Sequence, residues 1–287
     1  MMDVSSASSA EIFNTHLSLF QMKYIPSILL FAFATLTSSY ADSQLYAATG
    51  FANSAGELYI LDPADGSVIE DVGPLNDSEG NNYSLTGLRF DESTGLLFGI
   101  TGSSPTSPTS LVLVNPNNAR VSYVGGPFSS RLSDIAIDPL TDLMYAVSGS
   151  SKYFYLVEKL TGIDTRIGDT DVPPKRGGGL AANSRGVVYG TNDGTLVTYN
   201  KITGEASAVG DTNLSFFVGA LAFSPSNVLY GVEGGGATTD DGSATDDEAS
   251  TSNRERWLVV LNTTTGAAVE VGSTVGDLNA LAFIPTP

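Results

Sequence analysis

The chain has 287 residues and a formal net charge of −18, with 13 Lys and Arg against 31 Asp and Glu. The length suits one large domain or two smaller ones, and the acidity argues against binding to nucleic acid or anionic lipid, because like charges repel. The chain has no Cys, which excludes disulfides, Cys-ligated metals and thiol catalysis.

The N-terminal region has the pattern of a secretory signal peptide. Lys23 precedes an apolar run over residues 25–36, and a small-x-small cleavage site ends at Ala41. The run is shorter than the roughly 20 apolar residues that a membrane span requires. We therefore expect residues 1–21 to be an upstream extension, 22–41 a leader, and the mature chain to begin at Asp42 outside the cytoplasm, extracellular or periplasmic. An uncleaved anchor is the alternative.

Four short elements then recur along the chain in a fixed order. The first is an aromatic tripeptide, at residues 45–47, 97–99, 144–146, 188–190 and 229–231. The second is an alternating strand that ends in a turn, at residues 58–66, 111–118, 155–162, 196–204 and 258–266. The third is a Val/Ile-Gly pair, at residues 72–73, 124–125, 167–168, 209–210 and 271–272. The fourth is a strand similar to Leu-Ala-Phe, which starts at Leu88, Ile135, Leu180, Leu221 and Leu281.

These elements predict four short strands in each repeat of about 40–45 residues, which is the period of a β-propeller blade. The turns support hairpins, because Asp caps a turn, Pro presets φ and Gly accepts a positive φ. The first mature strand and the last strand are neighbouring elements of one repeat. We therefore expect an all-β, five-bladed propeller over 42–287, in which the C-terminal strand pairs with the N-terminal blade and closes the ring.

The pattern Leu-Tyr-Gly, Leu-Asp-Pro-x-Thr-Gly, Val-Gly and Leu-Ala-Phe-Asp-Pro resembles bacterial extracellular propellers of the YVTN and quinoprotein-like superfamily, several branches of which are domains of unknown function. The resemblance covers about residues 45–284. It implies that the Leu-Ala-Phe strand is innermost in each blade and the Val/Ile-Gly strand outermost. The Trp-containing motif that stacks on the quinoprotein cofactor is missing from this chain, so no cofactor is expected.

With this strand order the short turns fall on one face of the ring and the irregular loops on the other. Function is usually carried by variable loops on a rigid scaffold, so the loop face is the predicted binding face. Its acidic candidates, which could also serve as paired catalytic carboxylates, are Asp77, Glu79, Asp134, Asp169, Asp171, Asp211, Glu233 and Asp277. Its aromatic candidates are Tyr83, Phe128, Phe216 and Phe217, with core packing as the alternative. Arg131 and Arg176 are candidates for contacting an anionic ligand.

An acidic insertion at 234–255 interrupts the last blade. Its carboxylates could hold calcium, although their spacing does not fit an EF-hand, and a mobile acidic loop is the alternative. The candidate metal ligands are Asp240, Asp241, Asp246, Asp247 and Glu248.

The mature domain would lack His, because His16 is the only one in the chain and precedes the expected cleavage site. Ser-His-Asp triads and His-ligated metals are therefore excluded. The favoured hypothesis is a secreted, non-enzymatic binding or scaffold module whose loop face binds a glycan, peptide or surface protein. The alternative is a carboxylate-based enzyme that acts on glycans or hydrolyses lactones. Two or three acids that converge at the channel mouth, at least one of them buried, would favour the enzyme.

Overall fold

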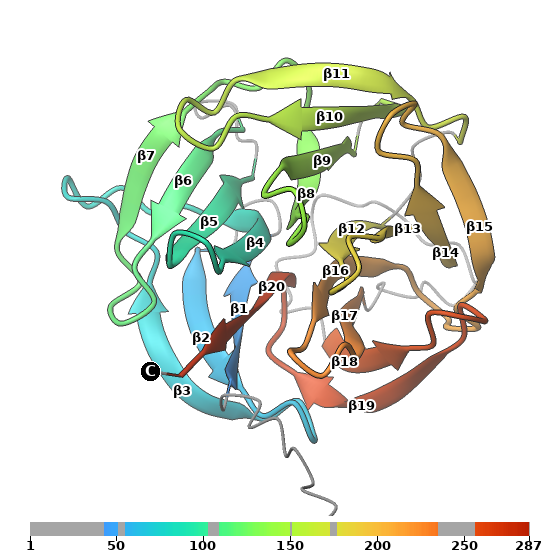
Figure 1. Cartoon of the computed structure of the whole chain (residues 1–287). Coiled ribbons are helices and arrows are strands. Elements are labelled where there is room, and N and C mark those ends of the chain that lie inside the picture. The colour runs from blue at the N-terminus through green and yellow to red at the C-terminus, as the bar shows by residue number, and fades with distance from the viewer. Residues whose placement is uncertain are drawn as a thin grey trace, which may run out of the picture. The chain divides into compact units, whose positions relative to one another are not determined.

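Ser39–Pro287 is the second of two units of the chain, and it contains every residue that the computed structural model of the protein describes. The described residues are 43–50, 55–102, 109–149, 151–172, 177–234 and 256–286. They form five sheets of four strands each, arranged as blades around an axis (Figure 1). All pairings within the blades are antiparallel, as between β4 and β5 (Leu85–Asp91 and Leu96–Thr101). The predicted fold class and blade number are confirmed.

Within each blade the strands follow chain order outward from the axis, except that the last strand of the chain is the innermost strand of blade 1. From innermost to outermost, the strands are: in blade 1, β20 (Leu278–Pro285), β1 (Ser43–Thr49), β2 (Glu57–Leu61) and β3 (Val68–Pro74); in blade 2, β4 (Leu85–Asp91), β5 (Leu96–Thr101), β6 (Leu111–Val114) and β7 (Val121–Gly125); in blade 3, β8 (Leu132–Ile137), β9 (Met144–Ser148), β10 (Tyr153–Val157) and β11 (Asp164–Asp169); in blade 4, β12 (Gly177–Ala182), β13 (Val188–Asn192), β14 (Thr195–Tyr199) and β15 (Ala206–Asp211); in blade 5, β16 (Val218–Phe223), β17 (Leu229–Gly234), β18 (Arg256–Leu261) and β19 (Ala268–Thr274).

The ring closes through its last strand. β20 pairs antiparallel with β1, with Tyr46 opposite Ala282 and Ala47 opposite Leu281. Blade 1 is therefore built from both ends of the domain, as the order of the repeats predicted. This pairing covers the edge of β1 that would otherwise be free to associate with another chain.

The apolar core lies between neighbouring blades. One cluster joins Leu58 and Ile60 of blade 1 to Leu88 and Val112 of blade 2, and corresponding clusters fill the other joints. The recurrent aromatic position is part of this core, with Tyr46, Phe98 and Tyr145 buried. Strand alternation explains the arrangement, because each strand presents one set of side chains to the preceding blade and the other set to the next.

The short turns are capped by their first residue. The carboxylates of Asp62, Asp91 and Asp138 each accept a hydrogen bond from the N–H two residues further on. The structure thus confirms the prediction that Asp caps these turns. Two of these aspartates also bind a lysine, which the sequence pattern did not indicate. Lys159 Nζ donates to Asp91 at 2.7 Å and Lys201 Nζ donates to Asp138 at 2.6 Å, each from the turn of the following blade.

The outermost strands run around the rim of the ring (Figure 1). In four of the five Val/Ile-Gly pairs the Gly lies against the outer turn of the following blade, whereas a Cβ at Gly73 would meet no atom within 4 Å. A Cβ at Gly168 would overlap the carbonyl oxygen of Thr203, and one at Gly125 would overlap that of Thr161. The same close approach recurs at Gly210 and Gly272, so the repeated glycine permits contact between successive blades.

Candidate functional site

Arg89 of β4 fills the axis of the ring. Its Nε donates to the carbonyl oxygen of Ile135 at 3.1 Å, and its Nη2 donates to those of Leu180 at 2.6 Å and Leu221 at 2.8 Å. These acceptors belong to the innermost strands of blades 3, 4 and 5, whose inner edges have no strand partner. One side chain thus satisfies carbonyl groups from three blades that would otherwise be buried without a donor.

Asp134 of β8 complements Arg89 at the axis. Its carboxylate accepts hydrogen bonds from the N–H groups of Ile135 and Leu180, both at 2.8 Å, and lies 3.8 Å from Arg89 Nη2. Burial raises the pKa of Asp134 to about 7, and the Arg89 guanidinium and the backbone donors offset part of that increase. Asp134 was a candidate catalytic carboxylate, but the structure places it in a hydrogen-bond network that ties blades together.

Asp77 and Tyr83 lie in the connection between blades 1 and 2. The Tyr83 hydroxyl donates to Asp77 at 2.9 Å, and the Asp77 carboxylate also accepts bonds from the Asn81 side chain and from two backbone N–H groups. The Asn81 bond is the main reason that the pKa of Asp77 is lowered to about 2. These bonds shape the loop itself, and Glu79 contributes its backbone N–H.

Glu233 forms a second group with the predicted Phe216 and Phe217. Glu233 lies at the end of β17 and is 2% exposed. One carboxylate oxygen accepts a bond from the Phe216 N–H at 3.0 Å, while the other is buried with no hydrogen-bond partner among the described residues. Burial raises the pKa of Glu233, partly offset by the Phe216 N–H. Phe217 packs close to Gly234 at the end of the same strand.

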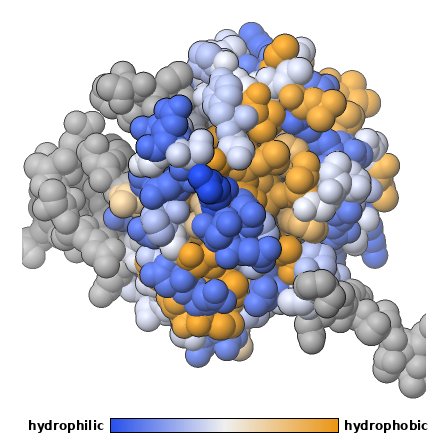
Figure 2. All heavy atoms as spheres, turned by 90° about the vertical axis from the view of Figure 1, so that its left-hand side faces the viewer, coloured by the Kyte–Doolittle hydropathy of each residue, from blue (hydrophilic) through white to orange (hydrophobic). Residues whose placement is uncertain are grey.

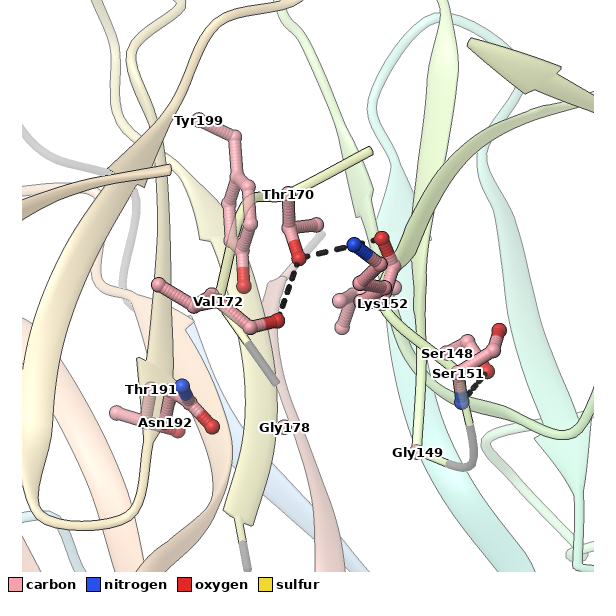
Figure 3. Close-up of a pocket in the computed structure, with 11 residues that line it drawn as sticks. Ser148, Gly149, Ser151, Lys152, Thr170, Val172, Gly178, Thr191, Asn192 and Tyr199 are labelled. Carbon is pink, nitrogen blue, oxygen red and sulfur yellow. Dashed lines mark hydrogen bonds between the residues drawn. The ribbon is translucent and has the colours of Figure 1, made fainter. Parts of the chain in front are cut away.

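Asp169 and Asp171 form the third group, beside a pocket between blades 3 and 4. Asp169 accepts a hydrogen bond from the Asp171 N–H at 3.0 Å and pairs with Lys152 at 2.8 Å. Lys152 lines the pocket together with Ser148, Ser151, Thr170, Thr191, Asn192 and Tyr199 (Figure 3). The lining combines hydroxyl, amide and ammonium groups with the apolar side chains of Val147 and Val172.

The pocket is small, and Tyr199 is the aromatic residue in its lining. A volume of about 20 Å³ accommodates a water molecule or one polar group of a ligand, but not a whole sugar ring. The Tyr199 ring stacks on Phe154 with centroids 4.9 Å apart, and burial raises the pKa of its hydroxyl. Figure 3 shows this hydroxyl directed into the pocket.

The other predicted site residues do not join these groups. Phe128 packs in the apolar core between blades 2 and 3. Arg131 is exposed, and its carbonyl accepts the N–H of Gly149. Asp211 accepts a bond from Thr195, and the carbonyl of Asp277 accepts the N–H of Gly50. The remaining candidates lie outside the described residues: Arg176, Asp240, Asp241, Asp246, Asp247 and Glu248.

Three important residues were absent from the predicted site. Arg89 had a usable signal, because it is the only charged residue at its position in the five Leu-Ala-Phe-like elements. Lys152 and Tyr199 had no such sequence signal. Lys152 is an ordinary loop lysine, and Tyr199 resembles any residue of an alternating strand. Within the described ranges, no three His, Asp or Glu side chains are grouped closely enough to hold a metal ion. Nor does any helix there have the length and apolar character of a membrane span.

No protein-family model and no curated protein matches the chain. Among solved structures, a chain of the nidogen/laminin complex is 12% identical, with 85% of this chain and 98% of that chain covered and a TM-score of 0.50. A putative TolB from Agrobacterium tumefaciens is 11% identical, with 86% and 99% covered and a TM-score of 0.51. The chain is a five-bladed β-propeller.

A third, more distant structure is the PQQ-bound aldose sugar dehydrogenase from Streptomyces coelicolor. It is 16% identical, with 65% of this chain and 61% of that chain covered and a TM-score of 0.40. The propeller fold that the resemblance implied is confirmed by the five blades themselves. At these identities the likeness says nothing about activity.

Proposed function

We propose that this propeller is a secreted, non-enzymatic binding module, and that the pocket between blades 3 and 4 on its loop face anchors the partner. The observation that carries the proposal is the Tyr199 hydroxyl. The Tyr199 ring is buried in its stack on Phe154, while its hydroxyl points into an open pocket, where a partner can reach it. A partner's carbonyl or carboxylate oxygen could accept its hydrogen bond.

Two further observations support a surface interaction. Arg89 occupies the axis, where a propeller could otherwise admit a ligand, so binding is directed to the faces of the ring. One of the similar structures comes from a complex between nidogen and laminin, so a chain with a similar fold takes part in a protein–protein assembly. We therefore favour a peptide or protein surface over a glycan as the partner.

The test compares Tyr199→Phe with Tyr145→Phe. Tyr145 lies at the other end of the same aromatic stack, so the control removes a hydroxyl from the stack but not from the pocket. The exported product of the full chain is screened on peptide and glycan arrays. One lost hydrogen bond of about 0.5–1.5 kcal/mol corresponds to roughly 2- to 13-fold weaker binding by Tyr199→Phe. Equal binding by both variants and the parent would refute the pocket as the anchor.

Export itself is tested by the intact mass of the secreted product. We expect a chain that begins at Asp42, because Lys23, the apolar run and Ala41 fit a cleaved leader. A product that retains Met22 would contradict the proposed processing.

Glu233 favours a second function, a carboxylate-based glycosidase or lactonase. Its unpartnered buried oxygen and its raised pKa suit a general acid. The test is a panel of glycoside and lactone substrates with Glu233→Gln and, as a control, the exposed Glu205→Gln. Turnover that only Glu233→Gln abolishes would establish the enzyme, and turnover that survives in Glu233→Gln would exclude this role for Glu233.

A further inference from the structure

The face opposite the loops carries a group of exposed aliphatic side chains. They lie on the short turns of blades 2, 3 and 4, and we call them the turn surface: Leu96, Leu140, Leu143, Leu160, Ile163, Val187 and Ile202. The most exposed are Ile202 at 86%, Leu160 at 85% and Leu140 at 67%. Figure 2 looks at the rim of the ring from the side of β6 and β7, so the face that carries the turn surface is seen edge-on there.

The residues of the turn surface are held together by the lysine bridges between blades. Lys159, next to Leu160, binds Asp91 of blade 2 and Asp142 of blade 3. Lys201, next to Ile202, binds Asp138 in the hairpin that also carries Leu140. The hairpin of blade 4, which carries Val187, is in close contact with the same Asp138 through Gly186. The aliphatic side chains therefore project from turns that are fixed against one another.

Folding does not require apolar residues at these positions. Leu160 and Ile202 occupy the same position of the repeated turn, where blades 5, 1 and 2 have Thr264, Ala64 and Asn117. The turn depends on the capping side chain and the glycine, as in the blade 4 turn, where Asn200 caps and Gly204 has a positive φ. Aliphatic residues at this position are thus confined to two adjacent blades, and their apolar surface remains in water. Such clusters mark interaction sites.

Charge indicates the kind of partner. The two lysines are already bound by aspartates, and the remaining charged residues of these turns are Glu92, Glu158, Glu205 and Arg185. The turn surface therefore has an acidic rim, on a chain whose net charge is −18. A second copy would bring like charges together, whereas a basic partner would gain attraction. We propose that the turn surface is a docking site for a protein segment with an aliphatic face flanked by Lys or Arg.

The experiment uses a labelled amphipathic peptide with one Leu face and one Lys face, titrated into the exported full-chain product and followed by fluorescence anisotropy. Two matched peptides replace Lys with Glu or Leu with Ser. We expect the Lys–Leu peptide to bind at least about tenfold more tightly than either matched peptide. Each matched peptide supplies only one of the two attractions, the apolar contact or the charge complementarity. Hydrogen exchange should show protection of residues 138–143, 158–163 and 200–204.

The key variant is Leu160→Ser with Ile202→Ser. It should weaken binding of the Lys–Leu peptide at least about tenfold. The melting temperature should not change, because exposed side chains contribute little to folding. The control is Ile69→Ser with Val269→Ser, two exposed residues of outermost strands, which should bind like the parent. Equal binding by both double variants, or equal binding of the Glu–Leu peptide, would overturn the proposal. So would sedimentation that shows a dimer lost only in the key variant. Tyr199→Phe should not affect this peptide, which separates the test from that of the loop face.

Discussion

The axis and the rim of the ring join the same five blades by different means. At the axis, a single pair, Arg89 and Asp134, satisfies the inner edges of several strands. At the rim, one contact between a glycine and a turn is repeated from blade to blade, as at Gly168 and Gly210. Repeated residues therefore specify the joints between neighbouring blades. The axis, which all five blades share, depends instead on residues that occur only once in the chain.

Removing β20 should have the largest effect on this arrangement. Deletion of residues 278–287 takes away the innermost strand of blade 1 and its buried residues Leu281 and Ala282. Because stacked blades share a continuous core, we expect the cooperative unfolding transition to be lost. Circular dichroism and thermal denaturation measure this, with deletion of residues 286–287 as the control. An unchanged melting temperature would contradict the closed ring.

Replacing Arg89 should have the next largest effect. Arg89→Ala leaves the buried carbonyls of Ile135, Leu180 and Leu221 without their donor and removes the positive charge beside Asp134. Breaking a buried pair in this way typically costs about 3–5 kcal/mol of unfolding free energy. Urea denaturation is the measurement, and Arg120→Ala, at an exposed position, is the control. A cost below about 1 kcal/mol would show that water replaces the guanidinium at the axis.

The pH dependence of stability should reveal the charge state of the axis. Since burial raises the pKa of Asp134 to about 7, folding favours its protonated form. The stabilisation that comes from the protonated carboxyl is fully present below the unfolded pKa near 4 and is lost as the pH rises through 7. Between these values the unfolding free energy falls with a slope approaching about 1.4 kcal/mol per pH unit. We expect the unfolding free energy of the parent, relative to that of Asp134→Asn, to fall between pH 4 and 7. A rise over that range would mean that Arg89 and the N–H donors outweigh burial.

A single joint at the rim should cost less than the axis. Gly168→Ala places a methyl group against the carbonyl of Thr203, so blades 3 and 4 must move apart locally. Overpacking of this kind typically costs about 1–3 kcal/mol. Ser122→Ala, on the exposed side of the outermost strand of blade 2, is the control and should change the unfolding free energy by less than about 0.5 kcal/mol. A loss as large as that of Arg89→Ala would remove the distinction between axis and rim.

The lysine bridges should have the smallest effect. Lys201→Ala removes the partner of the buried Asp138, which keeps its bonds to Leu140 and Thr141. We expect a loss of about 1 kcal/mol, and a smaller loss for Lys152→Ala, because water screens its pair with Asp169. Because Lys201 contributes to the lowered pKa of Asp138, the difference should vanish as the pH falls below the folded pKa of that group. Equal effects of the two substitutions would show that burial of the aspartate does not matter.

The sequence alone determined the blades. The recurrence of Leu-Tyr-Gly, the capped turns, the Val/Ile-Gly pairs and the Leu-Ala-Phe strands predicted the strand order, the number of blades and the closure by β20. These features are local and repeated, so each copy supports the interpretation of the others. The role of Asp62 and Asp138 in capping turns could be predicted for the same reason.

The side chains at the axis and in the pocket of the loop face could be identified only from the tertiary structure. Arg89 contacts Ile135, Leu180 and Leu221, which lie in three other blades, and no repeat records such contacts. The Tyr199 hydroxyl reaches a pocket only because blades 3 and 4 stack with their rings in register. Local preferences fix strands and turns, but the position of a side chain in a closed ring depends on how all the blades pack together.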